Sequence, residues 1–230
     1  MQAADILILS NGPGEVTTWV RPVVQALRQQ LGDDRSLFRI SVVLSPCPNG
    51  TGKEAAIAQS YPEVDRVQGA EHFFPFLLWG KTPENWDWRD KGVVVFLGGD
   101  QFFPVVIGKR LGYRTVVYAE WDARWLSWID RFGVMTPQII SKTPQKYADK
   151  LSVVGDLMAD VGLQVNRLQV ESSDWLANLE PSTVQPSNLQ PPTELIGLLP
   201  GSKPAKLMQG VPLSLAIAQH IHERRPQTRF

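Results

Sequence analysis

The sequence contains few of the residues that form disulfides and metal sites. Its 230 residues include one cysteine, Cys47, and three histidines, at positions 72, 220 and 222. A single cysteine excludes an internal disulfide and is typical of a reducing compartment. No histidine combines with Cys47 at a spacing known for zinc, so we predict no metal site. We interpret Cys47, in the turn-like segment SPCPNG, as incidental rather than nucleophilic.

The sequence also lacks a charge surplus and a long apolar run. Lys+Arg and Asp+Glu number 23 each, whereas nucleic-acid-binding domains usually carry a basic surplus, so we predict no nucleic-acid partner. The start, MQAADILILS, has acidic Asp5 where a signal peptide is basic, and its apolar run is too short. No stretch approaches the ~18 consecutive apolar residues of a transmembrane helix. These absences predict a cytoplasmic protein.

What is present is an ordinary apolar content and many tryptophans. With 43% apolar residues, a chain of this length forms one large domain, or one domain and part of another. There are eight tryptophans, and six of them lie between Trp79 and Trp128. This concentration indicates a surface that contacts another molecule.

Short apolar segments alternate with segments of helical periodicity. Val93–Phe96 has four β-branched or aromatic residues without a polar break, as in a strand buried on both faces. The alternation predicts an α/β fold, a Rossmann-like parallel sheet with helices on both faces. We expect strands at 6–9, 38–44, 64–67, 93–96, 114–119, 130–135 and 152–154, and helices at 16–31, 53–60, 103–111 and 138–150.

Asp100 follows the strand that we place at the centre of the fold. Leu97-Gly98-Gly99 ends the strand, and Asp100 precedes the predicted helix. Ligands of open α/β sheets bind outside the carboxyl ends of the strands, where a carboxylate can serve as a general base. An aspartate at this position is equally suited to cap the helix. The spacing leaves both interpretations open.

Two glycine-rich turns resemble nucleotide-binding motifs without matching them. SNGPGEV lacks the third glycine of the dinucleotide fingerprint, because Thr17 stands there. PCPNGTGKE has Cys47 at the first glycine of a phosphate loop, and Glu54 follows Lys53 where Ser or Thr should stand. The first turn lets the backbone approach a ligand closely, although a turn without a ligand is the simpler interpretation. We interpret the second as a loop and helix cap.

Aromatic residues gather in two further segments. In HFFPFLLWGKTPENWDW, residues 72–88, an apolar cluster is followed by basic residues, so it either lies in a membrane interface or packs on the sheet. In the second segment, aromatic and charged side chains follow the strand at 114–119, on the same side of the sheet as Asp100. We expect them to form a wall for a polyhydroxylated or acylated ligand: Tyr118, Glu120, Trp121, Asp122, Arg124, Trp125 and Trp128.

The composition changes after residue 163. Residues 164–193 are rich in Gln, Asn, Ser and Pro and predict a linker or a poorly ordered loop. A strand at 195–199, the turn LPGSKPAKL and a helix at 207–224 follow. We therefore predict a first domain at 1–163 and the start of a second at 194–230. One βα unit cannot bury its own core, so we expect the second domain to be incomplete.

Five segments, in order, resemble the lipid-A-disaccharide synthase family and its cyanobacterial-type relatives, glycosyltransferases of the two-domain GT-B architecture. GPGEV is similar to the family's first glycine turn, FLGGDQFFP to its strand ending G-I-D-A-P, and the segment 118–128 to Y-V-S-P-S-V-W-A-W. VVGDLMAD is similar to F-V-G-H-P-L-A-D, and LLPGSK to L-L-P-G-S-R. The aromatic cluster at 73–79 falls where the family has its membrane-associated, acyl-contacting region.

The resemblance implies a hexosyltransferase of lipid A biosynthesis that moves an acylated glucosamine from a UDP-sugar to a lipid-linked sugar acceptor, with inversion and without a metal or cofactor. Asp100 would be the catalytic base, and Gly201, Ser202 and Lys203 would stabilise the charge on UDP. It places the substrate-binding residues at Gly14, Glu15, Tyr118, Glu120, Trp121 and Asp122, and the membrane or acyl contacts at Phe73, Phe74, Phe76, Leu77 and Trp79.

The chain departs from the family pattern at several positions. Lys203 stands where the family prefers Arg, so a single ammonium charge would replace the two parallel hydrogen bonds that a guanidinium makes to a phosphate. Glu120, Trp121 and Asp122 replace small and polar residues and put the acceptor in doubt. We expect no transfer by this chain alone, since GT-B enzymes hold the nucleotide chiefly by a second half beyond residue 230. Two alternatives remain: a UDP-GlcNAc epimerase-like enzyme, and a non-catalytic lipid- or sugar-binding module.

Overall fold

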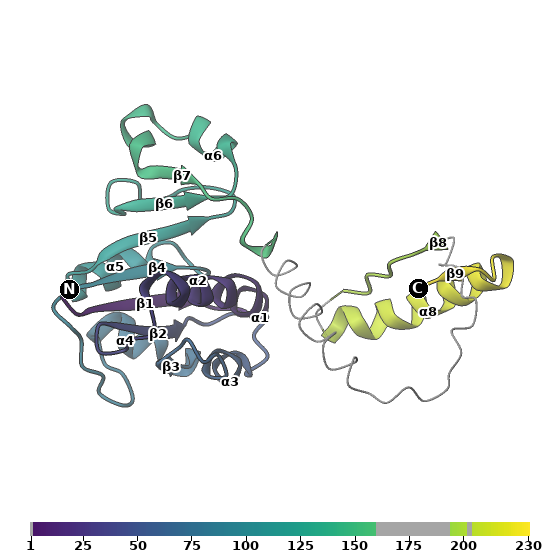
Figure 1. The fold of residues 1–230 in the computed structure, drawn as a ribbon, viewed down its shortest axis with the longest axis horizontal. Coiled ribbons are helices and arrows are strands. Elements are labelled where there is room, and N and C mark those ends of the chain that lie inside the picture. The colour runs from purple at the N-terminus through teal and green to yellow at the C-terminus, as the bar shows by residue number, and fades with distance from the viewer. Residues whose placement is uncertain (1, 160–193, 202–203) are drawn as a thin grey trace. The chain divides into compact units, whose positions relative to one another are not determined.

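The computed structural model describes residues 2–159, 194–201 and 204–230, and the chain divides into two units at residue 170 (Figure 1). In the first unit, seven parallel strands form one sheet in the order β3-β2-β1-β4-β5-β6-β7. This confirms the predicted Rossmann-like α/β fold. The strands are β1 (Ala4–Ser10), β2 (Phe38–Leu44), β3 (Arg66–Gln68), β4 (Gly92–Phe96), β5 (Arg114–Ala119), β6 (Arg131–Val134) and β7 (Leu151–Val153).

Alternate residues of β1 face two separate cores. Ile6 and Ile8 pack on one face of the sheet with Val16, Val20 and Val24, and with a buried alanine of the next helix. The elements on this face are α1 (Pro13–Glu15), η1 (Val16–Val20), α2 (Arg21–Leu31) and α3 (Glu54–Gln59).

Leu7 and Leu9 face the other core, together with apolar side chains of β4, β5 and β6. Phe76 and Ile107 are fully buried there, and burying such side chains contributes roughly 1.5–3 kcal/mol each. The elements on this face are α4 (Phe73–Trp79), α5 (Phe103–Leu111) and α6 (Pro137–Ser141). The short helix η2 (Ala70–His72) precedes α4, and its Ala70 packs against the first core.

Two predicted helices of the first unit differ clearly from the structure. The first begins at Pro13, three residues earlier than expected, and contains the π-helical turn η1, which ends two residues before Pro22, a residue without an amide hydrogen to donate. The predicted helix at 138–150 is wrong as a single element. It is divided into α6 and the 3-10 helix η3 (Gln145–Lys150), because Pro144 cannot continue a helix.

The side of the sheet where the strands begin, here called the amino edge, contains a buried ionic network. Arg39 Nε and Nη2 donate to the two oxygens of Asp5 at 2.8 and 2.9 Å, and the Arg89 amide and the Tyr113 hydroxyl each donate to Asp5 Oδ2 at 2.9 Å. Burial by itself would raise the pKa of the fully buried Asp5, but these hydrogen bonds outweigh it and lower the pKa. The network joins the starts of β1, β2, β4 and β5.

The second unit is described by itself. The two-residue strands β8 (Glu194–Leu195) and β9 (Thr228–Arg229) pair in parallel, and α8 (Pro204–Arg224) lies between them in the chain. Arg225 and Thr228 bind the carboxylate of Glu194 at 2.8 and 2.7 Å. β8 is shorter than the strand that we predicted at 195–199. The linker predicted at 164–193 lies outside the described residues. Among the described helices, none has the length and apolarity that crossing a bilayer requires.

Candidate functional site

The connections of the sheet reverse direction between β1 and β4. The chain runs outward from β1 to β2 and β3, and then returns to place β4 beside β1. Ligands of open α/β sheets bind at such a reversal, outside the ends of the strands, here called the carboxyl edge. The loops Asn11–Glu15 after β1 and Leu97–Phe102 after β4 lie at this position.

Asp100 lies on the second of these loops with its side chain exposed. The Phe102 amide donates to its Oδ1 at 2.8 Å, and the Phe103 amide donates to its backbone carbonyl at 3.0 Å. Phe102, not Asp100, occupies the capping position of α5. Asp100 is therefore not the helix cap that one alternative predicted, although one of its carboxylate oxygens orders the turn before the helix; its side chain is exposed, and its role as a general base stays a prediction.

Gly98 and Gly99 allow the β4 loop to approach its neighbours. Their φ angles are 146° and 110°, positive values that residues other than glycine rarely adopt. A Cβ on Gly98 would lie 2.8 Å from Asn11 Oδ1, and one on Gly99 would lie 2.8 Å from Ser45 Oγ. The loops after β1, β2 and β4 therefore meet at the base of Asp100.

Asn11 is a polar residue of the loop after β1 that we did not predict as a site residue. Its Oδ1 is buried and has no hydrogen-bond partner among the described residues. Buried acceptors are almost always paired, so an unpaired one needs an explanation such as a bound donor. Its position directly after β1, in SNGPGEV, was the available signal. Glu15 lies beside it, close to Gly98, and Gly14 is exposed on the same turn.

A polar cavity of about 380 Å³ extends from Asn11 along the ends of β2 and β3. Glu54 lines it and accepts hydrogen bonds from the Thr51 amide and hydroxyl at 2.5 and 2.8 Å. Burial would raise the pKa of Glu54, but these hydrogen bonds lower it, so the carboxylate stays charged. The remaining polar lining comes from Ser45, Cys47 and Glu71. The cavity can therefore receive hydroxyl or amine groups.

The predicted aromatic wall is divided by the structure. Tyr118 is buried against Trp19, and its hydroxyl donates to the Gly155 carbonyl at 3.2 Å, so the prediction that it contacts a substrate is wrong. Trp121 is 78% exposed. Glu120 is half-buried and Asp122 is exposed, so both remain accessible as predicted substrate contacts.

Gln101 fixes the loop that follows β5. Its side-chain amide donates to the Asp122 carbonyl and accepts from the Arg124 amide, both at 2.8 Å, and it is 6% exposed. Trp125, the next residue, has a φ of 58°, a conformation that costs a non-glycine residue roughly 1–2 kcal/mol. Lys150 supports the end of the loop through the Leu126 and Ile129 carbonyls, at 2.8 Å each. The loop is thus held in one strained conformation.

This loop and α5 form an apolar groove of about 460 Å³. The rings of Phe102 and Trp125 lie 4.8 Å apart, and the Lys109 ammonium lies 5.7 Å from the Trp128 ring. The groove is lined by Phe102, Val105, Val106, Lys109, Arg110, Trp125 and Trp128. Because the Phe102 amide also donates to Asp100, the groove begins next to Asp100.

The predicted membrane contacts of α4 separate into two sets. Phe73, Phe76 and Leu77 are at most 8% exposed and pack into the core, so the prediction is wrong for these three residues. Phe74 and Trp79 are 54% and 67% exposed, as is Leu78 at 54%, which the prediction did not include. The helix therefore packs on the sheet, as one of the two interpretations predicted, and presents a second, exposed face with Phe74, Leu78 and Trp79, for which contact with a membrane interface stays a prediction.

The predicted phosphate-binding turn is described only in part. Gly201 is exposed with a φ of 99°, while Ser202 and Lys203 lie outside the described residues.

No protein-family model and no curated protein matches the chain.

Proposed function

We propose that the chain contains the acceptor-binding part of a glycosyltransferase similar to lipid-A-disaccharide synthase, with Asp100 as the general base. The observation that carries this proposal is an exposed carboxylate at the point where the sheet connections reverse. A sugar hydroxyl is a poor nucleophile, and a carboxylate within hydrogen-bond reach can take its proton. The Phe102 amide orients Oδ1 of Asp100, which leaves Oδ2 to accept that proton.

The reaction in this proposal is one inverting displacement. The acceptor oxygen attacks the anomeric carbon of the UDP-sugar while its proton passes to Asp100. The bond between the anomeric carbon and the phosphate oxygen breaks, and UDP leaves with the electron pair. Gly201, Ser202 and Lys203 are the proposed contacts for the UDP phosphates, since amide groups and a cation stabilise negative charge.

The apolar groove beside Asp100 supports an acylated acceptor. Its aromatic walls and the flexible Lys109 suit a hydrocarbon chain attached to an anionic or polar head. The exposed residues Phe74, Leu78 and Trp79 of α4 support contact with a membrane surface, since the amphipathic Trp ring favours the headgroup region and the apolar Phe and Leu side chains can enter the acyl boundary beside it. The proposed protein is thus a peripheral one that takes its acceptor from a membrane.

The test is a transfer assay with the complete gene product that contains this chain. The donor is a UDP-activated acylated glucosamine, the acceptor is an acylated glucosamine phosphate, and the product is detected by mass spectrometry. We expect Asp100→Asn to lower the rate by about 10²–10⁴, the usual contribution of a general base. Asp90→Asn, an exposed carboxylate before the same strand, is the matched control and should retain the wild-type rate. Equal rates in both variants would contradict the proposal.

A second candidate is a non-catalytic lipid- or sugar-binding module, which the pre-formed groove favours. The same protein samples distinguish this candidate from a transferase. Saturable binding of the acceptor without any transfer product in the wild type, and with unchanged affinity in Asp100→Asn, would favour this candidate. Epimerised UDP-sugar as the product would instead favour an epimerase-like enzyme.

A further inference from the structure

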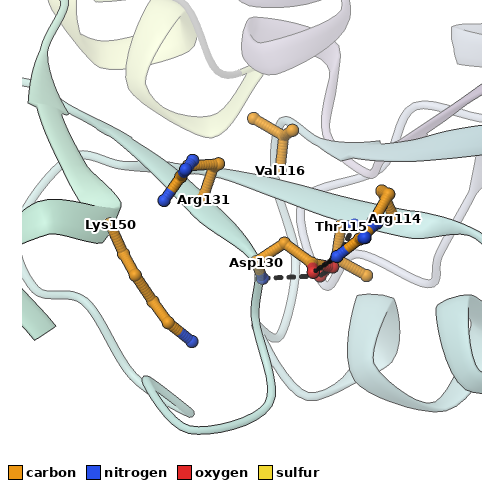
Figure 2. A pocket seen from close by; sticks show the side chains of 6 residues that line it. All are labelled: Arg114, Thr115, Val116, Asp130, Arg131 and Lys150. Atoms are coloured by element: carbon orange, nitrogen blue, oxygen red, sulfur yellow. Dashed lines mark hydrogen bonds and ion pairs between the residues drawn. The ribbon is translucent and has the colours of Figure 1, made fainter.

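A second charged cavity lies at the amino edge of the sheet (Figure 2). Its volume is about 460 Å³, and it is formed where three neighbouring strands begin. The lining residues are Arg114, Thr115 and Val116 of β5, Asp130 and Arg131 at the start of β6, and Lys150 directly before β7. We call it the basic cavity, because it contains three cations and one carboxylate.

The carboxylate is already paired. Arg114 donates to Asp130 Oδ1 at 2.7 Å, and the Thr115 amide and hydroxyl donate to Oδ2 at 2.9 and 3.0 Å. Burial would raise the pKa of Asp130, but these contacts lower it, so Asp130 is ionised and offsets the charge of Arg114. Two positive charges of the cavity remain without a counterion among its lining residues.

These two charges belong to Arg131 and Lys150. Arg131 is exposed, and its guanidinium makes one long hydrogen bond, 3.4 Å to the Asp149 carbonyl. Lys150 donates two of its three ammonium hydrogens to backbone carbonyls and lies 5.7 Å from the Tyr147 ring, so one hydrogen has no hydrogen-bond acceptor among the described residues. In Figure 2, both side chains extend on one side of Asp130, and Arg114 lies on the other.

We propose that the basic cavity binds a phosphoryl group, held mainly by Arg131 and Lys150. A phosphate monoester carries close to two negative charges at pH 7, which matches the two cations. The planar guanidinium of Arg131 suits two oxygens of one phosphate, and the Lys150 ammonium, already fixed by two carbonyls, adds a point charge with little further loss of freedom. The cavity volume admits a phosphate ester as well as the free ion.

The test is calorimetric titration of the 230-residue chain with inorganic pyrophosphate at low salt. We expect saturable binding that weakens about tenfold or more in Arg131→Gln, the cost of one charge-assisted hydrogen bond. Arg114→Gln should weaken binding less, because Arg114 is paired with Asp130. Lys142→Gln removes the same charge from the exposed end of α6 and should bind as the wild type does. No saturable binding, or equal affinities in Arg131→Gln and Lys142→Gln, would overturn the proposal.

Vesicles distinguish a lipid headgroup from a free phosphate compound as the source. Phosphatidylcholine vesicles with and without phosphatidic acid are sedimented with the same three variants. Retention that requires phosphatidic acid and is lost in Arg131→Gln identifies a headgroup. Pyrophosphate binding without such retention identifies a free phosphate compound. Arg131 and Arg114 are exposed, so both variants should unfold at the wild-type urea concentration, which separates lost binding from lost folding.

Discussion

The two edges of the seven-stranded sheet use aspartate in opposite ways. At the amino edge around β1, Asp5 is fully buried and accepts four hydrogen bonds, two of them from Arg39. At the carboxyl edge, Asp100 is exposed, and its side chain accepts one hydrogen bond, from the Phe102 amide. The carboxylate at the amino edge joins neighbouring strands through its hydrogen bonds, whereas the one at the carboxyl edge is accessible to a ligand.

The same contrast extends to the neighbouring groups. Arg39 also reaches Asp87 at 2.8 Å, and Arg66 lies over the rings of Trp86 and Trp88, so the charges near the start of β1 are held by several partners. Asn11, at the other end of the same strand, has a buried oxygen without a partner among the described residues. The basic cavity at the starts of β5 and β6 is the exception at the amino edge, which is why we assign it a ligand.

The largest expected effect is the loss of Asp5. Asp5→Asn removes the buried carboxylate that accepts from Arg39, the Arg89 amide and Tyr113 and leaves Arg39 only the exposed Asp87, and removing one partner of a buried ion pair costs about 3–5 kcal/mol. Urea unfolding followed by circular dichroism should show this loss. Asp100→Asn should change the free energy of unfolding by less than about 0.5 kcal/mol, as exposed substitutions usually do. Similar losses in both variants would remove the contrast between the edges.

The same network predicts an acid dependence. The lowered pKa of Asp5 means that its contribution is fully present above the unfolded value of 3.8 and is lost as the pH falls through the folded value. The difference in unfolding free energy between wild type and Asp5→Asn should therefore be constant from pH 7 to about pH 5 and narrow below about pH 4. A difference that does not depend on pH down to pH 3 would show that the charge of Asp5 is not what stabilises the fold.

A smaller effect is expected from Gln101, the structural residue of the carboxyl edge. Gln101→Ala leaves the Asp122 carbonyl and the Arg124 amide without their side-chain partner and should cost about 1–3 kcal/mol in urea unfolding. Gln138→Ala, on the exposed face of α6, is the control and should stay within about 0.5 kcal/mol. If both variants behave alike, Gln101 does not hold the loop.

The smallest effect concerns the strained backbone of Trp125. Trp125→Gly should be more stable than Trp125→Ala by about 0.5–1 kcal/mol, because glycine adopts a φ of 58° without the penalty that alanine incurs. The same pair of substitutions at Trp128, whose φ is not positive, should give the reverse order. Thermal unfolding of the four variants provides the comparison, and alanine being preferred at both positions would exclude strain at Trp125.

Much of this fold could be predicted from the sequence. The bounds of α5 and β5 agree with the prediction to the residue, because buried β-branched runs and helical spacing are strong local signals. The helix at 138–150 was not predicted correctly, since the apolar spacing continues across Pro144. The burial of Tyr118 and Phe76 was also missed, because apolar content alone does not tell which aromatic side chains of a segment face the core.

The candidate site was predictable only at Asp100. Its position between a strand and a helix is a local pattern. The meeting of Asn11, Ser45 and Gly98 depends instead on the order of the strands, which the sequence of one chain does not specify. The Gln101 contacts that hold the Trp125 loop join residues more than 20 positions apart, and no periodicity indicates them.

The central claim is that Asp100 acts as a base, whereas Asp5 maintains the structure. Chemical rescue tests it most directly. In the transfer assay with the complete gene product, added formate should restore part of the lost rate to Asp100→Ala, because a small carboxylate can occupy the vacated position and accept the proton of the acceptor. Formate should restore nothing to Asp5→Ala. A wild-type transfer rate of Asp100→Ala in the absence of formate, or equal responses of Asp100→Ala and Asp5→Ala to formate, would contradict the claim.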